Sequence, residues 1–248
     1  MQKYKGIIEY DGSKYFGMQK QIGRPTIQNA IENALSKFTG EVSKTIDYCG
    51  RTDAGVHAFG QVIHFEAPQK PIEQVLKGIN YFLNTQNEEI SIKHIAEVTL
   101  NFHSRFSCIG REYKYYIYNH PVRSPIFNKK MHHISQNINI ASMNKTKQFL
   151  IGKHDFSSFR GKACQALSPI KTVDFINISQ PLENIIEIHI GAKSFLYKMV
   201  RNITGALIYA GINRIKPEEI PNILAQKDIN ALPYTAPAHG LYFCKALY

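Results

Sequence analysis

Strand-like and helix-like segments alternate through the first hundred residues, and their order limits the folds open to this chain. The first helix follows Thr26, a residue type that favours helix N-caps, and stops at Gly40. The second opens at Pro71, since proline suits the first helical turn. Alternating or apolar runs predict strands at residues 4–10, 44–49, 60–65 and 90–98. The order β-α-β-β-α-β is that of a ferredoxin-like unit.

The second half shows a similar order of elements without a visible sequence repeat. Its pattern predicts an extended segment at 105–119 and strands at 171–179, 185–190 and 241–246. Helices are predicted at 140–150, 195–209 and 217–226. We therefore expect an α+β fold of two similar ferredoxin-like αβ halves, residues 1–104 and 105–248. Their strands could form one central sheet and leave a cleft between the halves.

The charge balance indicates a polyanionic partner. The 248 residues include 30 Lys and Arg but only 19 Asp and Glu, a net charge of +11. Nucleic acid is favoured over a membrane because the chain has neither a polybasic block nor a long apolar run. A basic surface that serves solubility alone is the other interpretation of this charge.

Cysteine usage and the N-terminal residues point to a reducing compartment. Four cysteines are scattered without a C-x-x-C pair, so neither structural zinc nor a disulfide framework is expected. The N-terminus runs directly into a strand-like segment and has no signal-peptide pattern. We expect a cytoplasmic protein.

Three places in the sequence could carry chemistry. In residues 50–58, Asp53 lies beside Arg51 between two glycines, although from composition alone a charged turn is usually only a turn. Residues 105–119 mix basic and aromatic side chains, which suits splayed RNA or, equally, tyrosines that line a core. Arg201 lies among apolar helix residues, where a cation usually extends to solvent, although one that faces a cleft would seek a carboxylate.

Ordered motifs along nearly the whole chain resemble the tRNA pseudouridine synthase A family. Four blocks carry the resemblance: EYDGSKYFG at 9–17, GRTDAGVHA at 50–58 with GQV at 60–62, RFS at 105–107 with REYKY at 111–115, and MVRNI at 199–203. Weaker matches are HDFSSFR at 154–160 and TAPAHGLY at 235–242. Met18 departs from the tryptophan that is common in the family, which leaves packing or a soft contact as its role.

The resemblance implies a fold, an activity and a set of site residues. It implies two similar halves around a largely antiparallel sheet, with a basic cleft between them that holds the active site. Uridines 38, 39 and 40 of the tRNA anticodon stem-loop would be flipped out and isomerised to pseudouridine. Asp53 matches the catalytic aspartate, Tyr113 the tyrosine against the uracil, Arg51 the arginine that holds the extruded nucleotide's place, and Arg201 the arginine that pairs with the aspartate. The family also implies a homodimer without metal or organic cofactor.

Other interpretations remain open from the residues alone. The chain could be a pseudouridine synthase for another RNA, or a non-catalytic RNA-binding protein of the same fold. Glu112 is the nearest rival carboxylate, although its strand position should point it away from the side of Tyr113. We expect His57 to be a packed or orienting turn residue. His132 and His133 are adjacent, so on a strand they would face opposite ways and could not easily share a metal ion.

Overall fold

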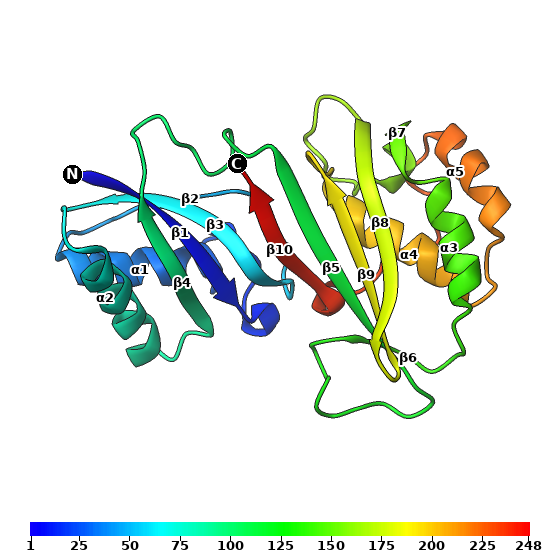
Figure 1. Ribbon diagram of the computed structural model, residues 1–248, viewed down its shortest axis with the longest axis horizontal. Coiled ribbons are helices and arrows are strands. Elements are labelled where there is room, and N and C mark those ends of the chain that lie inside the picture. Colours follow the sequence, from blue (N-terminus) through cyan, green and yellow to red (C-terminus); the bar gives the residue numbers. More distant parts are fainter. The chain divides into compact units, whose positions relative to one another are not determined.

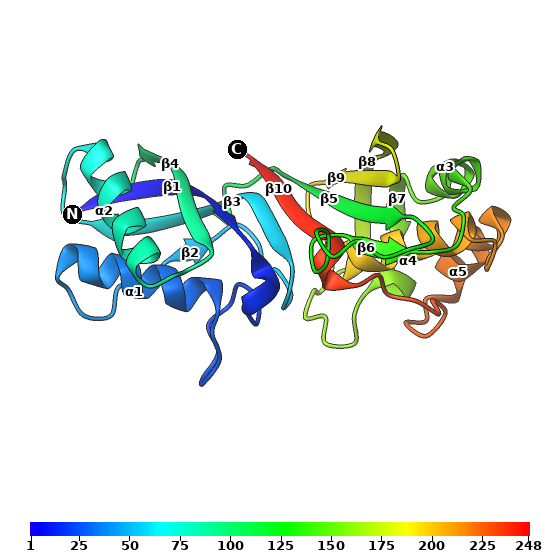
Figure 2. The same cartoon turned by 90° about the horizontal axis from the view of Figure 1, so that it is seen from below.

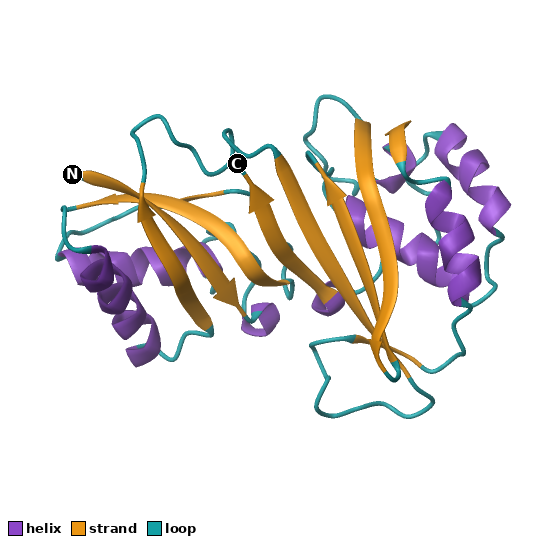
Figure 3. Ribbon diagram, viewed as in Figure 1, coloured by secondary structure: helices purple, strands orange, loops and turns teal.

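A computed structural model describes residues 1–248, which contain ten strands and five α-helices (Figures 1 and 3). The chain divides into two compact units. Unit 1 comprises Met1–Ile109 and Tyr242–Tyr248, and unit 2 comprises Gly110–Leu241. Most strand pairs in each unit are antiparallel, which confirms the expected α+β class. The predicted functional division into 1–104 and 105–248 stays a prediction.

Unit 1 has the predicted ferredoxin-like order. Three long antiparallel strands lie in the order β4-β1-β3, with bounds Ile90–Glu97, Gln2–Tyr10 and His57–Ala67. Strand β3 also pairs with two further strands, antiparallel with β2 (Asp47–Tyr48) and parallel with β10 (Leu241–Leu247). Helices α1 (Ile27–Thr39) and α2 (Ile72–Thr85) pack together on one face of the strands (Figure 2).

Local signals at the first helix are confirmed, whereas strand lengths around the acidic turn differ from the prediction. Thr26 Oγ1 accepts the Asn29 amide at 3.3 Å, and Gly40 ends α1 with a φ of 73°. The run at 44–49 forms only a two-residue strand, and β3 begins at His57 instead of residue 60. The turn that carries Asp53 is therefore shorter than the sequence suggested.

Unit 2 is also mainly antiparallel. Its strand order is β5-β9-β8-β7, with bounds Gly110–Asn119, Ile185–Ala192, Ile170–Leu182 and Gly152–Asp155. Strand β6 (His132–Ile134) pairs parallel with β5. The three helices are α3 (Ile140–Gln148), α4 (Met199–Gly211) and α5 (Ile220–Gln226). Strands β6 and β7 were not predicted, because three or four residues are too few to show a period.

Two predicted elements in the second half begin later than expected. Helix α4 starts at Met199 instead of residue 195, because Lys198 adopts a left-handed φ of 61° that no α-helix continues through. Residues 105–109 precede β5 and are not a strand. Apolar spacing cannot separate a helix from the turn that leads into it when buried residues lie in both. None of the helices combines the length and apolar character that crossing a membrane would require.

The two adjacent histidines of β6 point to opposite sides, as predicted. The His132 ring lies edge-on to Tyr115 with centroids 6.2 Å apart, and its Nε2 is 3.2 Å from the Tyr234 hydroxyl. The His133 Nε2 is 2.7 Å from the His120 carbonyl oxygen. Burial lowers the pKa of His132 to about 4, and the nearby His239 and His133 act in the same direction.

This depressed pKa predicts that unit 2 loses stability in mild acid. The folded state holds His132 neutral, whereas an unfolded chain binds a proton near the ordinary pKa of 6.5. Between pH 6.5 and 4 the unfolded state thus binds more protons, and stability falls as pH falls, by up to about 3 kcal/mol from this group. Urea unfolding at several pH values should show a shallower dependence for His132→Phe than for wild type. His133→Phe is the control, and equal slopes in wild type and His132→Phe would contradict the prediction.

Candidate active site

The acidic turn between β2 and β3 holds Asp53 at the surface of unit 1. The Val56 amide donates to the Asp53 carbonyl at 3.2 Å, and Gly55 completes the turn with a φ of 79°. Asp53 is half-buried and Arg51 is exposed. Arg51 also hydrogen-bonds the phenol of Tyr48, which opposes the rise that burial produces in the Tyr48 pKa. The turn thus presents a carboxylate and a guanidinium two residues apart.

The end of β1 and the segment after it support this turn through three contacts. The Met18 amide donates to the Thr52 carbonyl at 3.1 Å, and the Gly55 amide donates to the Tyr15 carbonyl at 3.3 Å. The hydroxyls of Tyr10 and Thr52 are 2.8 Å apart and buried. Burial raises the pKa of Tyr10 to about 12, so the phenol keeps its proton and its hydrogen bond at neutral pH. Hydrogen bonds therefore hold Thr52, just before Asp53, and Gly55, two residues after it.

Two glycines allow this close approach. A Cβ on Gly12 would lie 1.9 Å from the carbonyl oxygen of Val56, and a Cβ on Gly17 would lie 2.5 Å from that of Thr52. Gly17 also has a φ of 90°, which side chains rarely adopt. In the sequence, both glycines stand within the motif EYDGSKYFG at 9–17. Their role depends on contacts with residues some forty positions later, which no local pattern contains.

His57 and Met18 fill the space beneath the turn. His57 is buried at the start of β3, and its Nδ1 accepts the Gly12 amide at 3.1 Å and lies 3.0 Å from Asp11 Oδ1. The ring also stacks on Tyr242 at 4.6 Å. The prediction of a packed, orienting histidine is confirmed. Met18 is fully buried, so packing is its contribution where the family often has tryptophan.

Tyr113 lies on the buried face of β5 in unit 2. Its side chain is 8% exposed, and its ring meets the edge of the Phe195 ring with centroids 5.3 Å apart. Glu112 Oε2 lies 3.0 Å from His189 Nε2, within hydrogen-bond distance. Adjacent strand residues face opposite ways, as we expected for Glu112 and Tyr113. Phe195, which fixes the plane of the tyrosine ring, was not predicted because its segment was assigned to a helix.

Arg201, in the first turn of α4, is fixed by backbone contacts. Its Nε donates to the Ala236 carbonyl at 2.8 Å, and the Ala236 amide donates to the Arg201 carbonyl at 3.1 Å. Gly205 permits this arrangement, because a Cβ there would lie 2.2 Å from the carbonyl oxygen of Tyr234. The Arg201 charge also adds to burial in lowering the pKa of His239. Arg201 is therefore a positioned cation and not a loosely solvated one.

The four predicted site residues fall into two pairs. Arg51 and Asp53 share one turn of unit 1, and Tyr113 and Arg201 belong to unit 2. Arg201 influences Tyr115, two residues from Tyr113, by lowering a phenol pKa that burial raises. The expected pairing of Arg201 with Asp53 joins residues of different units and stays a prediction.

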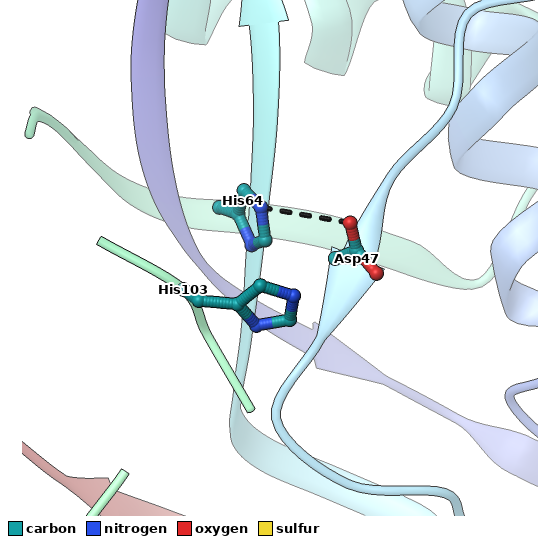
Figure 4. Close-up of side chains that lie close together, drawn as sticks. All are labelled: Asp47, His64 and His103. Atoms are coloured by element: carbon teal, nitrogen blue, oxygen red, sulfur yellow. Dashed lines mark ion pairs between the residues drawn. The ribbon is translucent and has the colours of Figure 1, made fainter. Parts of the chain in front are cut away.

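Unit 1 contains a cluster of three side chains that could be taken for a metal site, namely Asp47, His64 and His103. Their potential ligand atoms lie within 4.8 Å of one another. Figure 4 shows the three side chains close together. However, the Nδ1 of His64 accepts the Ser104 amide at 3.2 Å, and the Nδ1 of His103 accepts the Arg105 amide at 3.1 Å. A neutral ring whose Nδ1 accepts carries its proton on Nε2, the atom that would have to bind the metal. This cluster is better suited to an interaction between His64 and Asp47, whose nearest atoms are 3.6 Å apart.

Comparison with known proteins connects the chain to one family. A sequence profile described as tRNA pseudouridine synthase matches residues 7–107 and 147–248. Three curated relatives are each named tRNA pseudouridine synthase A. That of Buchnera aphidicola subsp. Acyrthosiphon pisum (strain APS) is 45% identical over 95% of this chain and 87% of its own. That of Buchnera aphidicola subsp. Schizaphis graminum (strain Sg) is 46% identical over 95% and 88%. That of Anaplasma phagocytophilum (strain HZ) is 40% identical over 99% and 100%.

The contact between Gly12 and Val56 predicts that an added methyl group displaces the acidic turn. Gly12→Ala should destabilise unit 1 by about 1–3 kcal/mol, the usual cost of overpacking, because its Cβ meets a backbone atom that cannot rotate away. Hydrogen exchange should accelerate at the amides of residues 52–56. Gly6→Ala is the matched control, since its Cβ meets no backbone atom but only side chains, Ile63 at 3.1 Å and Ile92 at 3.7 Å. Equal exchange rates in the two variants would show that the turn does not depend on Gly12.

Proposed function

The chain belongs to the tRNA pseudouridine synthase family, and we propose that it isomerises uridines 38, 39 and 40 in the anticodon stem-loop of tRNAs. The observation that carries this proposal is the anchored turn that presents Asp53, the carboxylate that the family motif assigns to catalysis. The net charge of +11 supports a nucleic-acid substrate. Pseudouridine synthases are isomerases, and the reaction consumes no second substrate.

The chemistry requires one well-placed carboxylate. The N1–C1′ bond of uridine breaks, the uracil turns, and a C5–C1′ bond forms. A proton leaves C5 and a proton is taken up at N1, so the reaction neither oxidises nor reduces the base. Asp53 attacks C1′ as a nucleophile or removes a sugar proton; both routes use the ionised aspartate. A fixed position for this group matters because small displacements from the productive geometry cost rate.

Tyr113 and the two arginines act on the extruded nucleotide. A uridine in a stem must leave the base stack before Asp53 can reach its sugar, which costs roughly a few kcal/mol. Tyr113, held edge-on by Phe195, packs against the flipped uracil. Arg51, exposed two residues from Asp53, occupies the space that the base leaves. Arg201 pairs with Asp53 and keeps the carboxylate ionised and oriented.

The finer properties of the enzyme follow the family. We propose a cytoplasmic homodimer that binds tRNA in a basic cleft and needs neither a metal nor an organic cofactor. Two alternatives are a pseudouridine synthase for another RNA and a non-catalytic RNA-binding protein. One experiment tests both: the protein is incubated with unmodified tRNA transcripts without added metal. Carbodiimide treatment and primer extension then map pseudouridine. Modification at positions 38–40 supports the proposal, modification elsewhere indicates another target, and bound but unmodified RNA indicates a non-catalytic binder.

Asp53→Asn should abolish turnover and spare binding. The amide keeps the shape of the side chain but supplies neither a nucleophile nor a base, so we expect product formation to fall by at least about 1,000-fold. The Kd for unmodified tRNA should change by less than about threefold. Asp47→Asn, an exposed carboxylate of the same unit, is the matched control and should retain activity. Appreciable turnover by Asp53→Asn would overturn the assignment.

Substitutions at Tyr113 separate stacking from hydroxyl chemistry. Tyr113→Phe keeps the ring and its contact with Phe195, so it should retain much of the binding of the flipped base. Tyr113→Ala should lose about 1–3 kcal/mol of stacking, seen as a lower kcat/KM. Tyr118→Phe, on the same strand beside His120 and Phe127, controls for effects on β5. A Phe variant as impaired as the Ala variant would show that the hydroxyl, and not the ring face, is what matters.

A further inference from the structure

The six residues between β9 and α4, here called the basic loop (193–198), lie outside both elements. Because α4 begins only at Met199, their sequence Lys-Ser-Phe-Leu-Tyr-Lys forms a surface loop and not a first helical turn. Its two lysines and Tyr197 take no part in the proposed reaction. The inference drawn from them rests on the proposed function, since it concerns how the same RNA is held.

The basic loop is attached to the strand that carries Tyr113. Arg111 Nη1 donates to the Lys193 carbonyl at 2.8 Å, at the start of the loop. In the middle of the loop, Phe195 meets the Tyr113 ring. Its last residue, Lys198, is only three positions before Arg201. An RNA nucleotide against Tyr113 would therefore have the basic loop as its immediate neighbour in unit 2.

The outward-facing part of the loop packs on the backbone at Gly161. Tyr197 is 42% exposed, and the Lys198 ammonium lies 5.4 Å from the centre of its ring. Below them, the Gly161 amide donates to the Tyr197 carbonyl at 2.7 Å. A Cβ on Gly161 would lie 2.6 Å from the Tyr197 ring, so the loop rests directly on this backbone. An exposed aromatic ring on a fixed backbone can accept a base without a large loss of conformational entropy.

The lysines of this surface have no acidic partners. Lys193, Lys198 and the adjacent Lys162 form no ion pair with a carboxylate. Elsewhere in unit 2, Lys114 is 3.1 Å from Glu187, and Lys227 is 3.7 Å from Asp155. Cations without counter-charges around an exposed aromatic ring are the combination that binds unstacked nucleotides, since phosphates meet the cations and a base stacks on the ring.

We propose that the basic loop, together with Lys162, binds the RNA backbone next to the flipped uridine. Lys193 and Lys198 contact phosphates that flank the target nucleotide, and Tyr197 stacks on a neighbouring unpaired base. The surface thereby holds the strand while the target base turns within the site. These contacts bind the substrate and the transition state about equally, so they lower KM more than they raise kcat.

The first test removes the two loop charges. In Lys193→Ala/Lys198→Ala, the Kd for unmodified tRNA should rise about tenfold or more at about 0.1 M salt. The slope of log K against log salt should become shallower by about 0.7–0.9 for each lost phosphate contact. KM should rise with the Kd, whereas kcat should fall much less. Lys145→Ala/Lys153→Ala, on α3 and β7 of the same unit, is the matched control and should leave the salt slope unchanged. A loop variant that binds like the control would overturn the proposal.

The second test concerns the exposed ring and guards against misfolding. Tyr197→Ala should weaken tRNA binding several-fold, and Tyr197→Phe should restore it, because stacking needs the ring but not the hydroxyl. A Phe variant that binds as poorly as the Ala variant would count against stacking. Failure of this inference is distinguishable from failure of the proposed function. If the wild-type protein makes pseudouridine and the loop variants bind tRNA as well as wild type, only the proposed role of the basic loop is refuted. If the wild-type protein makes no pseudouridine, the proposed function itself is refuted.

Discussion

The direct contact between the backbones of Gly12 and Val56 is the constraint on which the candidate site depends. It lets the segment after β1 lie against the turn before β3, so that backbone hydrogen bonds, together with the buried contact between the Tyr10 and Thr52 hydroxyls, hold the residues around Asp53. Backbone contacts from beneath leave Asp53 half-buried, so it is fixed in position and still accessible to a substrate.

Unit 2 positions its own charged residue in a similar way. Gly205 allows the chain at Tyr234 to lie on α4, and the Ala236 carbonyl then accepts from the Arg201 side chain. In both units a glycine removes the side chain that would separate two backbones, and a charged group is oriented without being sealed from solvent. A buried ion would carry a large desolvation cost, which this arrangement avoids.

The parts of the fold that could be predicted from sequence are those with local causes. Thr26 and Gly40 mark the ends of α1 because capping depends on residues within one turn. The start of α4 was misplaced because Leu196 and Met199 are both buried, so apolar spacing continues across the real boundary. For the site, composition showed only a charged turn at Asp53, and the family resemblance supplied its role. Nothing local could indicate that Gly12 and Gly17 would meet the turn, since those contacts exist only after folding.

Because α4 begins only at Met199, consecutive side chains of the basic loop lie in different surroundings. Phe195 packs against Tyr113, Leu196 is buried in the core, and Tyr197 faces solvent. Within two residues the loop turns from Phe195, which packs against Tyr113, to Tyr197, which is exposed beside Lys198. Support of Tyr113 and the RNA contact that we propose therefore share one short backbone segment, and a displacement of that segment would disturb both.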